Sequence, residues 1–109
     1  MIRLKDLREV RNAELLPQAT INKPVSYFVE HFGANLVRGE DDLDFFEGAG
    51  FVLDDIVPFA LMHYRGYPPN TTTVYLPFGI QGVNEIAAIV SRIAKETDIT
   101  PAHITWQRT

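Results

Sequence analysis

Residues 43–77 are the part of the chain that most restricts its fold. They are rich in aromatic and β-branched residues, which fit the pleated, half-buried surface of a β-sheet. Two groups of turn-forming residues interrupt them, the pair Asp54 and Asp55 and the segment 66–70. The segment therefore predicts three antiparallel strands in a β-meander. The expected strands cover residues 44–53, 56–65 and 71–76.

Glycine and proline predict irregularities within this meander. Gly48 and Gly50 indicate a bulge or a bend in the first strand, because glycine inside a strand often marks such a feature. Pro58 cannot donate a backbone hydrogen bond, so we expect it near a strand end, at a sheet edge or at a bulge.

The turn between the first two strands also predicts their register. A two-residue turn places Phe45 opposite Tyr64 and Asp44 opposite Arg65. Opposite charges directly across an antiparallel pair attract each other. We therefore expect a cross-strand ion pair between Asp44 and Arg65.

Two segments show the periodicity of amphipathic helices. In residues 24–32 and 83–96, apolar residues recur every three or four positions, so that each segment has one apolar face. Pro24 suits the first turn of the earlier helix, and Asn22 is its expected N-cap. Gly33 can adopt the left-handed conformation that ends a helix.

The two ends of the chain give weaker signals. Residues 1–16 have apolar residues at loosely helical spacing, and Pro17 would end such a helix. We expect this segment to be a peripheral helix or an arm. Residues 104–107 predict a short final strand, with Trp106 in the core.

Together these elements predict a single α+β domain over residues 1–109. Two amphipathic helices can cover one face of a sheet. We therefore expect a two-layer sandwich, in which the helices cover a mostly antiparallel sheet made of the three-strand meander and the C-terminal strand. A ferredoxin-like arrangement, with residues 18–21 as an additional strand, is the alternative.

The composition excludes several classes of protein. The chain has 109 residues and no cysteine, which excludes a disulfide scaffold, thiolate metal sites and a cysteine nucleophile. No apolar run approaches the roughly 18 residues of a membrane span, and residues 1–11 lack the apolar core of a signal peptide. The basic stripe typical of nucleic-acid binding is missing. We therefore expect a cytoplasmic protein that binds neither membranes nor nucleic acid.

Negative charge is concentrated in residues 40–55. The formal net charge is −4, and this segment holds half of the 14 Asp and Glu residues and no Lys or Arg. Asp41, Asp42 and Asp44 are therefore candidates for contacts with a basic partner protein. The alternative is a solvated loop and strand edge. The spacing does not fit a calcium-binding loop, and we expect no metal here.

A second candidate binding region lies at the end of the second expected strand. His63, Tyr64, Arg65 and Tyr67 gather aromatic and cationic side chains near a loop, and Tyr and Arg contribute strongly to protein interfaces. The guanidinium group can also bind a carboxylate or a phosphate. Ordinary cross-strand packing is the alternative interpretation.

The sequence offers no catalytic or cofactor motif. His31, His63 and His103 do not have the spacing of a metal site. Ser26 and Ser91 lie on expected helices, and neither belongs to a nucleophile elbow. We therefore expect no cofactor and assign no catalytic residue.

These observations lead to two functional hypotheses. The first is a small non-enzymatic protein–protein interaction domain, either a homodimer or the acidic partner of a basic protein. The second is a small ligand-binding protein or enzyme with a site around residues 63–67, in which Asp44 or Glu47 would act as a base.

Overall fold

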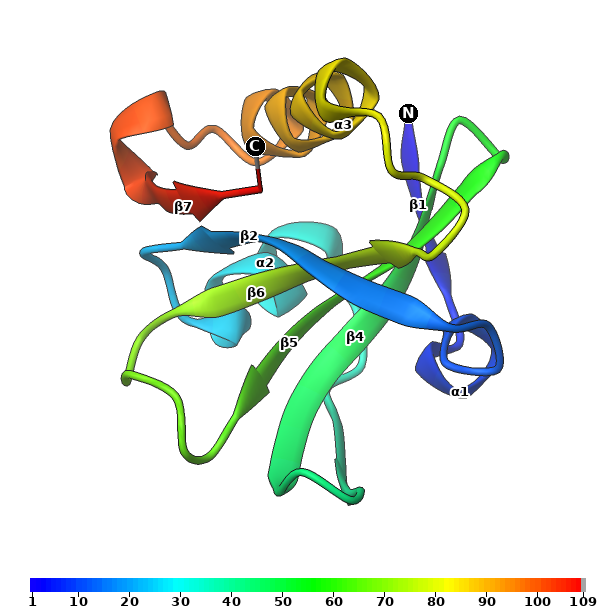
Figure 1. Ribbon diagram of the computed structural model, residues 1–109. Coiled ribbons are helices and arrows are strands. Elements are labelled where there is room, and N and C mark those ends of the chain that lie inside the picture. Colours follow the sequence, from blue (N-terminus) through cyan, green and yellow to red (C-terminus); the bar gives the residue numbers. More distant parts are fainter. Residues whose placement is uncertain (109) are drawn as a thin grey trace.

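The computed structural model describes residues 1–108. These residues form an α+β fold in which two main helices pack on a seven-stranded antiparallel sheet (Figure 1). The predicted fold class is therefore confirmed. The elements are β1 (Ile2–Lys5), α1 (Leu7–Val10), β2 (Leu15–Ile21), α2 (Val25–Phe32), β3 (Val37–Glu40), β4 (Phe45–Leu53), β5 (Val57–Tyr64), β6 (Thr72–Pro77), α3 (Val83–Glu96), a 3₁₀ turn (Pro101–His103) and β7 (Ile104–Gln107).

The predicted meander of β4, β5 and β6 forms the middle of the sheet. The strand order is β1-β4-β5-β6-β2-β7, and β3 pairs with the remaining part of β4. Both β6 and β7 are antiparallel to β2, which lies between them, so β6 and β7 run in the same direction. The sheet twists strongly, and β2 and β4 cross in the view of Figure 1.

Residues 1–16 are neither one helix nor an arm, which corrects the expectation for this segment. They contain β1, the one-turn helix α1 and the start of β2. β1 and β3 lie end to end along the outer edge of β4, where unpaired backbone groups would otherwise remain exposed. Pro17 does not end a helix but lies in β2, beside a β-bulge.

The β4–β5 hairpin differs by one residue from the expected register. The turn includes Asp54 and Asp55, both with positive φ, but Ile56 also remains outside the ladder and Leu53 pairs with Val57. A one-residue shift turns every side chain of one strand to the other face of the sheet. The observed register is the one that buries Phe59 against Phe51.

Gly48 and Gly50 do not mark a bulge, because β4 pairs continuously with β5. Their role is close packing instead. A Cβ on Gly48 would lie 2.6 Å from the Leu61 carbonyl oxygen, and one on Gly50 would lie 2.7 Å from that of Lys5. Pro58 is near the start of β5, outside the residues that pair with β6, as expected.

The sheet buries side chains on both of its faces. The larger core, on one face, contains Phe51, Phe59 and Leu61 and is covered by α2 and α3. The smaller core, on the other face, contains Met62 and Tyr64 and is covered by α1 and the residues around it. Strand β5 supplies both cores because its side chains alternate between the two faces.

Three details at the element ends test the expectations for the helices and for β7. Pro24 is the N-cap of α2, so the prediction of Asn22 was wrong, whereas Gly33 ends the helix with φ 64° as predicted. Trp106 is 44% exposed and does not lie in the core. It is on β7, the last strand at one edge of the sheet.

Candidate functional site

The two candidate binding regions meet at one end of the β4–β5 hairpin. Phe46 pairs with Tyr64, so the β3–β4 turn (residues 41–44) lies beside the β5–β6 loop (residues 65–71). We call this region the open end of the hairpin; it is at the bottom of Figure 1. The opposite end, closed by the turn at Asp54, is called the turn end.

Asp41 is the centre of a hydrogen-bond network at the open end. Its Oδ2 accepts hydrogen bonds from the Tyr64 hydroxyl and from Nη2 of Arg11, each at 2.6 Å. Its Oδ1 accepts from the backbone N–H groups of Leu43 at 2.9 Å and Asp44 at 3.4 Å. One carboxylate thus connects the end of α1, strand β5 and its own turn.

This network fixes the protonation states of its members. Burial raises the pKa of Asp41, but the hydrogen bonds from Tyr64, Leu43 and Asp44 and the charge of Arg11 outweigh it, so the net pKa is lowered. Burial, and then the hydrogen bond to Asp41, raise the pKa of Tyr64 to about 12. Near pH 7 the pair is a carboxylate and a neutral phenol. A general base needs a pKa near the working pH, and neither group has one.

A second set of contacts lies on the face of the sheet that carries α2. Asp44 and Arg65 form the expected ion pair, with 2.9 Å between Oδ1 and Nη2, although the strand register differs from the prediction. The guanidinium group of Arg65 also lies over the Phe45 ring, 4.6 Å from its centroid. The Nε2 atom of His63 is 3.1 Å from the Pro68 carbonyl oxygen and must donate, because a carbonyl oxygen only accepts.

On the other face, three tyrosines and Arg11 line a hollow of about 270 Å³. The ring of Tyr64 is 5.7 Å from that of Tyr67 and 6.3 Å from that of Tyr75, measured between centroids. Burial, and then the neighbouring Tyr67 and Tyr64, raise the pKa of Tyr75, so this phenol also stays neutral. The hollow presents aromatic rings and hydroxyl groups to a bound molecule.

Most of the acidic segment is neutralised within the chain. Five of its seven acidic residues lie within 4.0 Å of a cationic group from outside the segment. Glu40 and Asp42 have no such partner among residues 1–108. The paired residues are Asp41 with Arg11, Asp44 with Arg65, Glu47 with Arg38, Asp54 with Arg92 and the N-terminus, and Asp55 with Arg3.

A groove that the sequence did not predict lies at the turn end, between the β4–β5 turn and α3. Its volume is about 640 Å³, and apolar side chains provide most of its surface. Both walls are at the top of Figure 1. Ile56, which was expected to begin a strand, projects from one wall and is 78% exposed. We call this feature the turn-end groove. Its apolar lining includes Ile56, Val57, Pro58, Ile80, Ala88 and Ile89.

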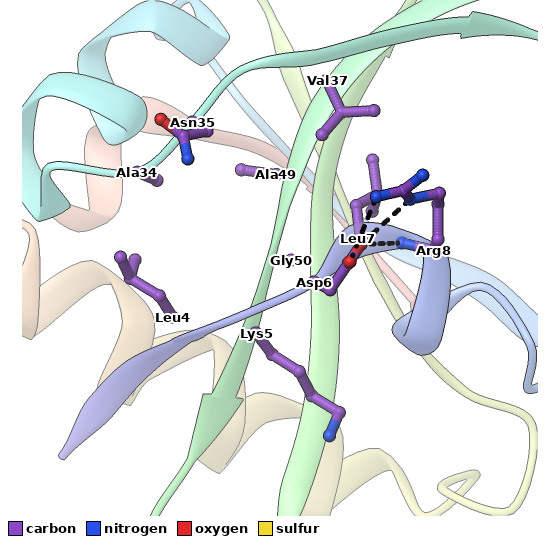
Figure 2. Close-up of a pocket in the computed structure, with 10 residues that line it drawn as sticks. All are labelled: Leu4, Lys5, Asp6, Leu7, Arg8, Ala34, Asn35, Val37, Ala49 and Gly50. Carbon is purple, nitrogen blue, oxygen red and sulfur yellow. Dashed lines mark hydrogen bonds and ion pairs between the residues drawn. The ribbon is translucent and has the colours of Figure 1, made fainter.

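A third hollow lies between β1, α1 and the start of β3, and Figure 2 shows its lining. The charged groups at its rim already have partners. The Asp6 carboxylate caps α1 by accepting from the Arg8 N–H at 2.9 Å, and Lys5 pairs with Glu9 at 3.4 Å. This hollow therefore presents no free charge to a ligand.

Sequence reasoning missed several residues at the open end. Arg11 and Tyr75 are far from residues 41–67 in the chain, and only the sheet topology brings them there. Phe45 was expected to pack across the strands, yet it is exposed. The expected register placed Phe45 opposite Tyr64 instead of beside Arg65, so no sequence signal indicated this exposure.

Within residues 1–108, no three or more His, Asp or Glu side chains are grouped to hold a metal ion. In the same residues, no helix combines the length and the apolar character needed to cross a membrane. Comparison with known protein families, with curated proteins and with solved structures found no match. The two hairpin ends therefore carry the features that bear on function.

Proposed function

We propose that the protein is a non-enzymatic protein-binding domain whose partner docks on the open end of the β4–β5 hairpin. The observation that carries this proposal is the exposure of three large side chains there: Leu43 is 73% exposed, Phe45 47% and Tyr67 42%. Arg65 lies over the Phe45 ring. Aromatic residues and Arg are enriched where protein interfaces gain most of their binding energy.

The hydrogen bonds and ion pairs at the open end support the proposal. Asp41 holds the backbone N–H of Leu43, and Arg65 is fixed between Asp44 and the Phe45 ring. Side chains that are already ordered lose less conformational entropy when a partner binds. The open end therefore resembles a preorganised contact surface.

The ion pairs bear on the charge of the partner. Because Asp41 and Asp44 are neutralised within the chain, they act as supports for Leu43 and Arg65 rather than as direct contacts. Glu40 and Asp42 have no ion-pair partner within residues 1–108 and can bind a cationic group of the partner. We infer that the partner presents an apolar surface with a few basic groups at its rim, which would increase the association rate at low salt.

A matched pair of variants tests this function. Purified protein is immobilised, and proteins retained from cells that produce it are identified. Each retained protein is then purified and titrated by calorimetry against wild type, the Phe45→Ser/Tyr67→Ser variant and an Ile56→Ser control at the turn end. We expect the double substitution to weaken binding at least tenfold and Ile56→Ser to leave it unchanged. Equal binding by all three proteins, or no specific partner, would overturn the proposal.

A small-molecule site is the second candidate, and the tyrosine hollow beside Arg11 favours it. Its rings can stack on a planar ligand, and its hydroxyl groups can hydrogen-bond to one. A fragment screen by NMR, with the Tyr64 and Tyr75 resonances as reporters, tests this candidate. Fragments that shift these resonances, but not that of Tyr27, would support a ligand site; uniform or absent shifts would exclude it.

A further inference from the structure

The proposed function does not involve the turn-end groove, and helix α3 forms one wall of this groove. Its α3 wall is made by Glu85, Ala88, Ile89 and Arg92, which share one flank of the helix because they are three, four and seven residues apart. The core of the protein holds a different face of α3, which includes Ile86, Val90 and Ile93. Ile89 is only 7% exposed and belongs to the core, so the part of this flank that nothing in residues 1–108 covers is made by Glu85, Ala88 and Arg92.

We propose that two copies of the chain form a symmetric dimer in which α3 of each copy lies in the turn-end groove of the other. A twofold interface uses the same surface on both copies, so that surface must contain both a ridge and a matching groove. Here α3 is the ridge, and the groove lies directly beside it, bounded on its far side by Ile56 and Pro58.

The charges along α3 fit this arrangement. When the twofold axis is perpendicular to α3, the two α3 helices run antiparallel. If their crossing point is between Ala88 and Ile89, Glu85 of one copy faces Arg92 of the other, and the same contact forms twice. Ala88 has a small side chain at the crossing point, where the two helices must approach most closely. The flank is thus complementary to itself in charge.

Arg92 still has a hydrogen-bond donor, Nε, that can take part in this contact. Its Nη1 and Nη2 atoms each donate to Asp54 at 3.0 Å, and Nη2 also donates to Glu96 at 3.4 Å. Nε has no hydrogen-bond partner within residues 1–108. Because the Asp54 pair already fixes the guanidinium group, the second copy's Glu85 would meet a preorganised donor.

The oligomeric state in solution tests the proposal. Sedimentation equilibrium on the full chain is compared for wild type, Ala88→Glu and the control Ser91→Glu, which adds the same charge at an exposed position of α3 outside the groove lining. We expect a concentration-dependent dimer for wild type and Ser91→Glu, and at least tenfold weaker association for Ala88→Glu, which places two carboxylates together at the twofold axis. A wild type that stays monomeric up to about 1 mM, or equal effects of both substitutions, would overturn the proposal.

Charge exchange provides a second readout that does not depend on Ala88. Glu85→Arg alone should weaken the dimer, because Arg then faces Arg92 twice. Mixing this variant with Arg92→Glu should restore association as a heterodimer, since each contact again joins opposite charges. Circular dichroism establishes first that both variants are folded. Folded variants that do not associate on mixing would contradict the antiparallel contact. Loss of association in an Ile56→Ser variant would support contact between the second copy and the far wall of the groove.

Discussion

The two ends of the β4–β5 hairpin are held in place by different kinds of interaction. At the open end, the Asp41 carboxylate accepts four hydrogen bonds from three parts of the chain. At the turn end, Asp54 lies at the surface and is bonded to Arg92 and to the N-terminal amino group, while apolar side chains form the groove beside it. Both carboxylates belong to the same acidic segment.

This difference shows that local density of charge does not define a functional patch. An acidic residue that is partly buried and fully hydrogen-bonded supports the structure, and its removal leaves other polar groups unpaired. An acidic residue in an exposed ion pair contributes less, because solvent and salt screen it. We therefore expect substitutions at the open end to affect stability more than equivalent substitutions at the turn end.

The largest loss of stability should come from a substitution of Gly50, which packs against the backbone at the start of α1. A Cβ at this position would lie 2.7–2.9 Å from backbone atoms of Lys5 and Leu7. Gly50→Ala must push α1 away from the sheet and, with it, move Arg11 away from Asp41. We expect a loss of about 2–3 kcal/mol in the free energy of unfolding, measured by urea denaturation.

Gly79→Ala is the control for Gly50→Ala. No atom lies within 4 Å of a Cβ at Gly79, and its φ is not in the positive range. The free energy of unfolding should change by less than about 1 kcal/mol, in the stabilising direction. Equal losses at both glycines would contradict the close packing of α1 on β4.

The next largest effect is expected at Asp41. Asp41→Ala removes the acceptor of four hydrogen bonds and leaves the Tyr64 hydroxyl and Arg11 unpaired, so the free energy of unfolding should fall by about 2 kcal/mol. Asp42→Ala, one residue along the same turn, should change it by less than about 0.5 kcal/mol, because Asp42 is exposed. Similar losses for the two variants would mean that the turn tolerates removal of the network.

A smaller effect is expected from Tyr64→Phe. This substitution removes one of the four donors to Asp41 and keeps the ring that packs on Phe46 and Tyr75. The free energy of unfolding should fall by about 1 kcal/mol. The pKa of Asp41 should rise, since a hydrogen bond that lowers it is lost, and NMR titration of the carboxyl carbon measures this shift. An unchanged pKa would exclude Tyr64 as a significant partner.

The smallest effect at pH 7 is expected at the turn end. Asp54→Asn keeps a residue that tolerates positive φ, removes the charge and replaces one of the two oxygens that accept from Arg92 with an NH2 donor. Hydrogen bonds from Arg92 and the N-terminus lower the pKa of Asp54 from 3.8 to about 2. The stabilisation from Asp54 is therefore complete above pH 3.8 and lost between pH 3.8 and about 2. The difference between variant and wild type should disappear across that window and shrink with added salt. A pH-independent difference would show that charge is not its cause.

Asp41 provides the comparison in the same pH experiment. Its folded-state pKa is also lowered, so its stabilisation is present at neutral pH and is lost as the pH falls below 3.8. The partly buried network should make the Asp41 effect less sensitive to salt than the Asp54 effect. Thermal denaturation at two ionic strengths measures both.

Sequence periodicity predicted the elements whose neighbours are close along the chain. The apolar face of residues 83–96 and the left-handed Gly33 depend on local spacing, and both were predicted. The three meander strands were also predicted, because turn residues separate them. The fold class followed from these elements.

The predictions that failed concern elements whose structure depends on residues distant in the sequence. Residues 2–5 form a strand because the outer edge of β4 needs a partner, and no local pattern reveals that need. The hairpin register depends on Phe51 meeting Phe59, which the length of the turn alone does not determine. At the open end, the pairing of Asp44 with Arg65 was predicted, whereas the approach of Arg11 required the full topology.

The position of β2 in the sheet has a consequence for how the chain folds. β2 precedes α2 in the sequence, yet both of its neighbours, β6 and β7, come from residues after Pro69. Its apolar residues have no sheet partner while the first two-thirds of the chain are being synthesised. Such non-local pairing slows folding, typically to milliseconds or seconds. We expect one late, cooperative step in which β2 enters between β6 and β7, instead of a gradual growth of the sheet from the N-terminus.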